Sequence, residues 1–179
     1  WTKRKRMKIF FIILTSIFFF FQPPPTFAQS DYVLPYPSFM PGSKLYAMEQ
    51  IQEKLLQYWY FGSYGQFTYN LNQADKYLVE SKTLFEYKQY FLAHRALQKS
   101  DEYFKKLPTF LENAEKQKKN TTEKKKLLSD AALKHIEVLT QLKTNLPEQF
   151  VWRPEKSSPT EFKIGENIDH AIKIRKEAL

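Results

Sequence analysis

The fold is decided by residues 67–107, whose sequence is FTYNLNQADKYLVESKTLFEYKQYFLAHRALQKSDEYFKKL. Apolar or small residues recur in it at alternating spacings of four and three, which is the pattern of helices that each bury one face. Residues 86–89 separate two such series. The first is Phe67, Leu71, Ala74, Leu78, Ser81 and Phe85, and the second is Tyr90, Ala93, Leu97, Ser100, Phe104 and Leu107.

The two series permit either an antiparallel helical hairpin or one long helix whose buried face shifts part-way along. At about 1.5 Å per residue, a single helix over residues 67–107 would be about 60 Å long, which is awkward for so small a domain. We therefore predict the hairpin, with its turn at residues 86–89.

The residues before the hairpin predict a proline-rich extended segment and then a first helix. Prolines at 35, 37 and 41 disfavour helix before Gly42, because each biases its preceding residue toward extended backbone. Ser43 is a potential N-cap, and the apolar residues after it recur at spacings of three and four. This predicts a one-sided amphipathic helix over residues 44–60, whose buried face is Leu45, Met48, Ile51, Leu55, Tyr58 and Trp59.

Beyond the hairpin, a short helical continuation follows Pro108. The capping-box spacing of Asn120 and Glu123 then predicts a helix that ends before Pro147. The apolar face of that helix is Leu128, Ala131, His135, Val138 or Leu139, and Leu142.

The C-terminal part predicts a strap and a last helix. Residues 150–154 predict an extended strap pinned by Trp152. Ser158-Pro159-Thr160-Glu161 places a serine N-cap before a proline at the first helical position and a glutamate at the third. The helix that we expect from there buries Ile164, Ile168 and Ile172.

No stretch shows the sustained alternation of a β-strand. The sequence therefore predicts an all-α fold, a bundle of four to six antiparallel helices with the helical hairpin at its centre, after a proline-rich extended segment. We expect residues 1–28 to be a signal peptide, residues 29–43 the proline-rich segment and residues 44–179 the bundle. About 150 residues can bury roughly 70% of their unfolded surface without disulfides.

The N-terminal residues have the pattern of a cleavable secretory signal peptide. Residues 9–21 form an apolar run that is too short to span a membrane, since a spanning helix needs about 20 apolar residues. We expect cleavage after Ala28 rather than Ser30, and translation from Met7 rather than Trp1. An uncleaved N-terminal anchor is the alternative. The basic residues that precede the run are Lys3, Arg4, Lys5, Arg6 and Lys8.

The charge balance changes once the N-terminal segment is set aside. The chain holds 28 Lys and Arg against 19 Asp and Glu, a net charge of +9. Residues 1–28 hold five basic and no acidic residues, so the remainder has 23 against 19, or +4. Because much of the excess belongs to the targeting segment, the composition does not indicate nucleic-acid binding. The chain holds no cysteine, which excludes disulfides, thiol nucleophiles and cysteine metal ligands.

The residues Pro41-Gly42-Ser43-Lys44-Leu45-Tyr46, preceded by Leu34-Pro35-Tyr36-Pro37, carry a resemblance to a known family. They resemble the opening of a bacterial family of exported helical domains of unknown function. The resemblance covers about residues 32–107, and it implies an exported helical domain without assigning an activity. We interpret the motif as structural. Pro41 fixes the approach, Gly42 turns the chain, Ser43 caps the first helix, and Leu45 with Tyr46 anchors its first turn.

The side chains that carry catalysis or bind metals form no recognisable set. His94, His135 and His170 are far apart in the sequence, with no His-x-x-x-His or Glu-x-x-His pair. His135 lies on an apolar helix face, which favours a hydrogen-bonded core histidine over a metal ligand. Ser81 and Ser100 lack the Gly-x-Ser-x-Gly elbow. We therefore predict no catalytic residue, no cofactor and no metal ligand.

Aromatic residues crowd residues 58–69, and one buried helix face cannot hold all of them. Those left exposed could stack on sugar rings or contact a partner. Alternatively, the turn is a closed, aromatic-packed end of the bundle. The candidate binding residues here are Trp59, Tyr60, Phe61 and Tyr64.

A lysine cluster around Asn120 is the second candidate for binding. It could contact anionic headgroups or wall polymers. A solvated tip between two helices explains it equally well. Its members are Lys116, Lys118, Lys119, Lys124, Lys125 and Lys126.

These features predict an exported, non-enzymatic helical binding or scaffold module at the bacterial cell envelope. We expect its partner to be an envelope protein, a glycan or an anionic polymer, not nucleic acid, with membrane contact only through an uncleaved signal segment. The alternative is an extracytoplasmic enzyme or metal-binding helical bundle that uses histidine and carboxylate side chains. Convergence of His94 and His135 with two carboxylates would favour that alternative.

Overall fold

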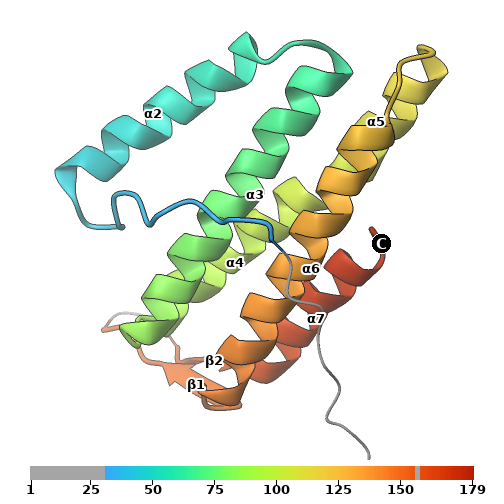
Figure 1. Ribbon diagram of the computed structural model, residues 1–179. Coiled ribbons are helices and arrows are strands. Elements are labelled where there is room, and N and C mark those ends of the chain that lie inside the picture. Colours follow the sequence, from blue (N-terminus) through green and yellow to red (C-terminus); the bar gives the residue numbers. More distant parts are fainter. Residues whose placement is uncertain (1–30, 156–157) are drawn as a thin grey trace, which may run out of the picture.

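The computed structural model describes residues 31–155 and 158–179 (Figure 1). These residues form a helical bundle with a small antiparallel sheet at one end. The elements are α2 (Lys44–Trp59), α3 (Gly62–Glu86), α4 (Tyr90–Phe104), α5 (Leu107–Lys116), α6 (Thr122–Thr144), β1 (Gln149–Trp152), β2 (Thr160–Lys163) and α7 (Ile164–Lys176). The predicted all-α bundle is confirmed, whereas the signal-peptide prediction lies outside the described residues.

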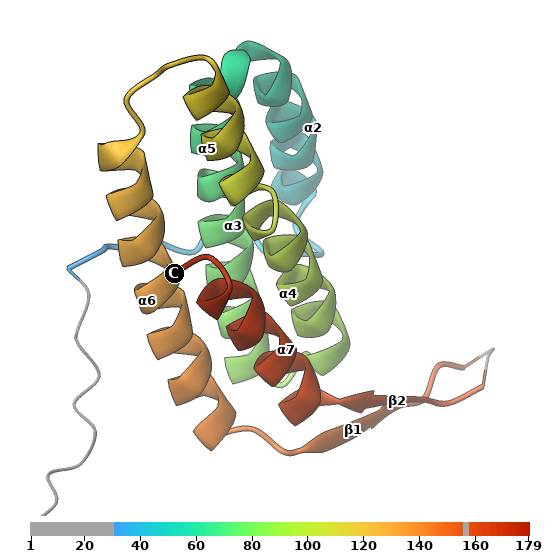
Figure 2. The same ribbon diagram turned by 90° about the vertical axis from the view of Figure 1, so that its right-hand side faces the viewer.

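Helices α3 and α4 form the predicted antiparallel hairpin at the centre of the bundle (Figures 1 and 2). Their turn is short, and its Lys88 has a left-handed backbone with φ of 59°. Two serines on the predicted buried faces are fully buried and bond across to the neighbouring helix. Ser81 Oγ donates to the carbonyl of Ala93 (2.9 Å), and Ser100 Oγ donates to the carbonyl of Ala74 (2.7 Å). The hydroxyl groups are therefore satisfied inside the core.

Two apolar clusters fill the bundle between α3 and the helices that follow it. Each member named below is at most 4% exposed, and burying such a side chain stabilises the fold by roughly 1.5–3 kcal/mol. The members of both clusters that the structure describes lie between Tyr32 and Ala178, so we expect residues 31–179 to fold as a unit. One cluster contains Leu78, Leu97, Leu139 and Ile168, and the other contains Phe67, Phe104, Leu107 and Leu128.

The last helix begins later than the sequence predicted. Thr160 and Glu161 belong to β2, which pairs with β1 in an antiparallel register that places Phe150 opposite Phe162. The helix-start prediction at Ser158 is wrong, because aromatic contacts hold the chain extended up to Lys163. Trp152 of β1 stacks on Phe91 of α4 with ring centroids 4.4 Å apart, and Phe162 of β2 meets the same ring at 5.7 Å. The capping pattern is local and is outweighed by this strand pairing.

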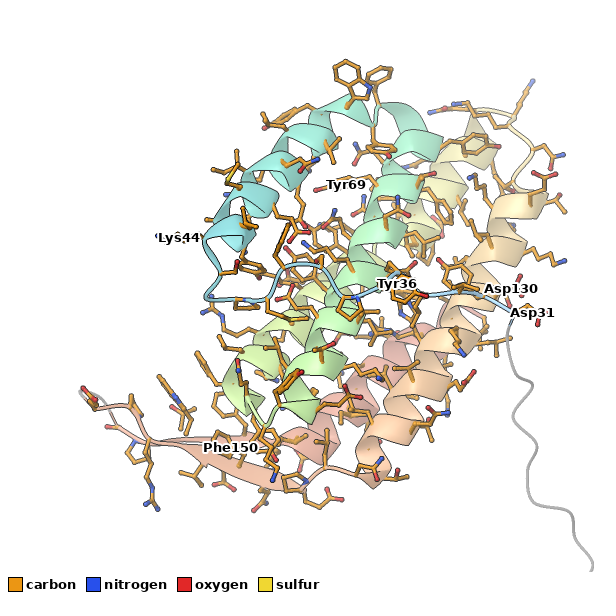
Figure 3. The ribbon with its side chains drawn as sticks, turned by 60° about the vertical axis from the view of Figure 1, so that its left-hand side comes forward. Asp31, Tyr36, Lys44, Tyr69, Asp130 and Phe150 are labelled. Atoms are coloured by element: carbon orange, nitrogen blue, oxygen red, sulfur yellow. The ribbon has the colours of Figure 1, made fainter. Side chains whose placement is uncertain are left out.

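Residues 31–42 are extended and cross α3 on the way to α2 (Figure 3). Gly42 has φ of 98°, a left-handed backbone that favours glycine. Ser43 is the N-cap of α2, and its Oγ accepts from the backbone N–H of Leu45 (3.3 Å). Tyr46 anchors the first turn through a hydrogen bond to α3, while Leu45 is 47% exposed.

Candidate functional site

Helix α2 turns its apolar face to solvent. The prediction that this face is buried is wrong, since its residues are between 47% and 82% exposed. They recur at spacings of three and four and therefore form one continuous stripe along the helix. We call this stripe the α2 apolar face, and its members are Leu45, Met48, Ile51, Leu55, Tyr58 and Trp59.

The opposite, polar side of α2 faces α3. Glu53 is only 8% exposed, forms an ion pair with Lys76 of α3 and accepts from the hydroxyl of Tyr77 (2.9 Å). Lys76 also pairs with Glu49 (3.2 Å). A buried charge must be paired, so these contacts hold α2 with its acidic side inward. The α2 apolar face is exposed because α3 presents polar partners to α2.

Two tyrosine hydroxyls complete this polar layer between α2 and α3. Tyr46 Oη donates to Glu80 Oε1 (2.9 Å), and Tyr69 Oη donates to the carbonyl of Glu53 (3.1 Å). Tyr69 is drawn between the two helices in Figure 3. Burial raises the pKa of Tyr46 and of Tyr77 above the usual tyrosine range, so both hydroxyls remain neutral donors. Burial also raises the pKa of Glu80.

The predicted aromatic residues near the α2–α3 turn separate into exposed and inward ones. Trp59 and Phe61 are 79% and 80% exposed. Tyr60 is half-buried, with its ring 5.9 Å from that of Tyr69. The closed-end interpretation therefore describes Tyr60, while Trp59 and Phe61 remain available for contact.

The structure brings the aromatic-rich residues 58–69, which we call the aromatic turn, and the lysine cluster to one end of the bundle. Tyr64 Oη donates to the carbonyl of Asn120 (2.6 Å), and Lys119 Nζ lies 5.3 Å from the centre of the Tyr64 ring. Lys124 lies over the ring of Phe67 at 5.8 Å. Cations within about 6 Å of an aromatic face are attracted to it. The two candidate features are thus neighbours in space, although 56 residues separate Tyr64 from Asn120 in the sequence.

The remaining lysines of the cluster differ in their contacts. Lys118, Lys125 and Lys126 are all exposed. Lys125 forms an ion pair with Glu115 (2.6 Å), and Lys118 has a left-handed backbone with φ of 59°. The cluster therefore presents its charge at the loop between α5 and α6.

His135 is a buried, hydrogen-bonded core histidine, as its apolar helix face predicted. Its Nε2 lies 2.7 Å from Asp75 Oδ1, and its Nδ1 accepts from Arg175 Nε (3.4 Å). Nδ1 is thus the acceptor and Nε2 the donor of a neutral ring. Burial lowers the pKa of His135, which also favours the neutral form. Tyr32 Oη donates to the other oxygen of Asp75 (2.5 Å).

Arg175 of α7 extends this buried polar network to α4. It is fully buried, forms an ion pair with Asp101 and donates to Ser100 Oγ (2.8 Å). Burial raises the pKa of Asp101 and lowers that of Arg175, while the ion pair opposes both changes. Sequence analysis missed Arg175, because one arginine among the basic residues of α7 carries no signal of burial. The network links α3, α4, α6 and α7 and explains how polar groups are tolerated in the core.

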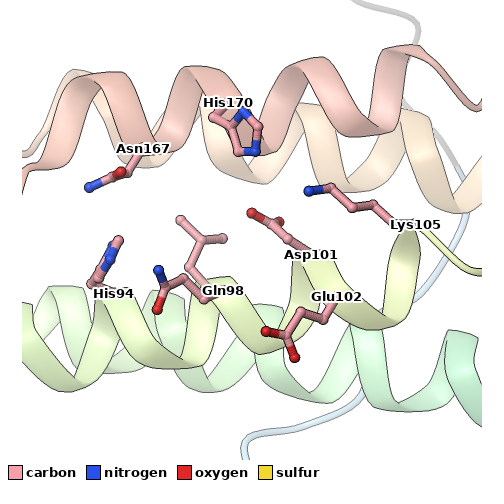
Figure 4. A pocket seen from close by; sticks show the side chains of 8 residues that line it. His94, Gln98, Asp101, Glu102, Lys105, Asn167 and His170 are labelled. Carbon is pink, nitrogen blue, oxygen red and sulfur yellow. The ribbon is translucent and has the colours of Figure 1, made fainter.

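A polar groove of about 260 Å³ lies between α4 and α7 (Figure 4). His94 and His170 line it together with Asp101 and Glu102, whereas His135 does not. Burial lowers the pKa of His94. The convergence of His94 with His135 that would favour an enzyme or metal site is thus not found. Among the residues that the structure describes, no group of three His, Asp or Glu side chains could hold a metal ion.

Comparison with protein families matches residues 38–149, more than half of the chain, to the family described as Domain of unknown function (DUF5667). The chain belongs to this family. The DUF5667 match contains the whole α2 apolar face, the aromatic turn and the lysine cluster, whereas Arg175 lies beyond it. No curated protein and no solved structure matches the chain.

The surface of this DUF5667 domain combines exposed apolar and aromatic side chains with a neighbouring cationic loop. In the described segments 31–155 and 158–179, no helix has the length and hydropathy needed to cross a membrane.

Proposed function

We propose that this DUF5667 domain is an exported, non-enzymatic binding or scaffold module of the bacterial cell envelope, and that the α2 apolar face is its binding surface. One observation carries the proposal: α2 buries its acidic side against α3 and exposes its apolar side. Export is supported by the signal-peptide pattern of residues 7–30.

The exposed surface is large for a protein of this size. Tyr58, Trp59 and Phe61 are about 80% exposed, and at about 150–250 Å² per aromatic side chain they present roughly 500 Å². The largest apolar patch of a typical monomer is about 300–600 Å², before the aliphatic members of the α2 apolar face are added. Patches larger than this range mark contact sites, and the aliphatic members of the α2 apolar face enlarge this one, which supports binding as the role of the domain.

The partner that we propose is an envelope component, namely a protein, a glycan or an anionic polymer. Exposed aromatic rings suit sugar rings and apolar protein surfaces, and the lysine cluster suits anionic groups. The overall charge does not favour nucleic acid, since the basic residues outside the N-terminal segment nearly balance the acidic ones.

Co-sedimentation of residues 31–179 with isolated bacterial envelopes, at low and at high salt, tests the proposal. We expect retention at both salt concentrations, because apolar contacts are not screened. The double variant Ile51→Ser/Leu55→Ser should lose retention, since it removes two central members of the α2 apolar face. Tyr87→Ser is the matched control, because Tyr87 is 73% exposed but lies at the α3–α4 turn. If the unmodified protein sediments with envelopes at neither salt concentration, the proposal of envelope binding is wrong.

A further inference from the structure

We propose that the α2 apolar face docks on an anionic lipid interface, with α2 lying along the membrane surface. The inference rests on the proposed binding function and names the class of partner. It also revises the expectation that only the signal segment contacts a membrane. A separate prediction buried the apolar residues of α2, whereas the structure exposes them.

The side chains of the α2 apolar face are distributed as in interfacial helices. Aliphatic or Met side chains occupy the stripe from Leu45 to Leu55, and Tyr58 and Trp59 lie at its C-terminal end, next to the exposed Phe61. Tyr and Trp favour the headgroup region, because their rings are apolar and their tips are polar. Helices of this type insert their apolar face about 5–10 Å into the boundary between headgroups and acyl chains.

Charge is what favours a lipid interface over other occupants. Helix α2 contains two acidic and two basic residues. Glu49 and Glu53 face α3 and are paired with Lys76, whereas Lys44 and Lys54 are exposed. The charge that α2 presents to a partner is therefore basic, as anionic headgroups require.

The lysine cluster lies at the same end of the bundle as the C-terminal end of α2. The C-terminal end of α2 and the α5–α6 loop both lie at the top of Figure 1. The hydrogen bond from Tyr64 to Asn120 holds the start of α3 against that loop. Basic residues near an anionic membrane each strengthen binding by about fivefold.

A second copy of the chain fits this surface less well. Pairing two α2 helices would place the exposed Lys44 and Lys54 of one copy against a surface that presents the same lysines. Like charges beside a helix–helix contact oppose pairing. The acidic residues that could complement them, Glu49 and Glu53, are already engaged with Lys76.

The docking surface is also pre-formed. The polar layer holds α2 as a helix before any partner binds, so binding does not have to order it. Interfaces that are ordered in advance bind more tightly, because less conformational entropy is lost.

Tryptophan fluorescence can test the proposal on residues 31–179 carrying Trp152→Phe, which leaves Trp59 as the only tryptophan. Phenylalanine keeps the stack of residue 152 on Phe91. We expect vesicles of phosphatidylglycerol and phosphatidylcholine to shift Trp59 emission to shorter wavelength, and pure phosphatidylcholine vesicles to do so far less. Ile51→Ser and Leu55→Ser should each lower the partition coefficient about tenfold. Lys44→Gln and Lys54→Gln should each lower it about fivefold at low salt.

Tyr87→Ser is again the control and should bind vesicles like the unmodified protein. Equal binding to both vesicle types, an unshifted Trp59 or full binding by Ile51→Ser/Leu55→Ser would overturn the proposal. Retention on envelopes without vesicle binding would overturn it too, while leaving the binding function intact with a protein or glycan partner. If light scattering showed a dimer in which Trp59 is buried and which does not bind vesicles, the α2 apolar face would instead be assigned to a second copy. If the unmodified protein bound neither vesicles nor envelopes, both proposals would be wrong.

Discussion

Replacing Arg175 by leucine tests whether the buried polar network stabilises the bundle. The guanidinium group is fully buried and donates to Asp101, to Ser100 Oγ (2.8 Å) and to the carbonyl of Ala171 (3.1 Å). Leucine would leave the carboxylate of Asp101, which is 7% exposed, without its cation. Removing one partner of a buried ion pair costs about 3–5 kcal/mol. That is a large share of the roughly 5–15 kcal/mol by which domains are stable.

We therefore expect Arg175→Leu to lower the free energy of unfolding by about 3–5 kcal/mol, measured by urea unfolding at pH 7.5 with circular dichroism. The loss should shrink at acidic pH. Burial raises the pKa of Asp101, and the protonated carboxyl no longer needs a cation. Lys143→Gln is the control and should have little effect, since it breaks only the exposed pair with Asp169 (2.7 Å) between α6 and α7. A loss below about 1 kcal/mol, or equal losses in both variants, would refute the reasoning.

Three further predictions concern pH, α2 and a glycine. Because burial lowers the pKa of His135, the folded state resists protonation, so this residue should reduce stability as the pH falls below about 6.5. His135→Gln should reduce the difference in the free energy of unfolding between pH 7.5 and pH 5. Glu53→Ala should speed limited proteolysis within α2, because Lys76 loses its most buried partner; unchanged cleavage would contradict the role of the polar layer. Gly65→Ala should cost about 1–3 kcal/mol in thermal unfolding, since its Cβ would lie 2.9 Å from the backbone carbon of Tyr60. Gly165→Ala should cost less, because it meets only the flexible end of the Glu148 side chain.

The central hairpin could be predicted because its information is local. Within residues 67–107, apolar and small side chains recur at helical spacing, and that spacing predicts which face each helix buries. The burial of Ser81 and Ser100 followed from their places in the same series. The short strands could not be predicted in this way, since β2 depends on its pairing with β1 and on the contact of Phe162 with Phe91, which is far away in the sequence.

The candidate site could be predicted only in part. Crowding among residues 58–69 showed that some aromatic side chains must be exposed, but it did not separate Trp59 and Phe61 from Tyr60. Nor did it show that the aromatic turn and the lysine cluster are neighbours. The hydrogen bond between Tyr64 and Asn120 forms only because the tertiary fold brings the start of α3 next to the α5–α6 loop.

The sequence by itself determined that this protein is helical, that α3 and α4 form a hairpin and that α2 has one apolar and one polar side. Tertiary structure decided which side of α2 is buried. Periodicity identifies the two faces of a helix but does not say what the neighbouring helix presents to them. Here α3 presents Lys76 and Tyr77, and a buried Glu53 is stable only beside such partners. The acidic side therefore turns inward, and the apolar side is exposed to solvent.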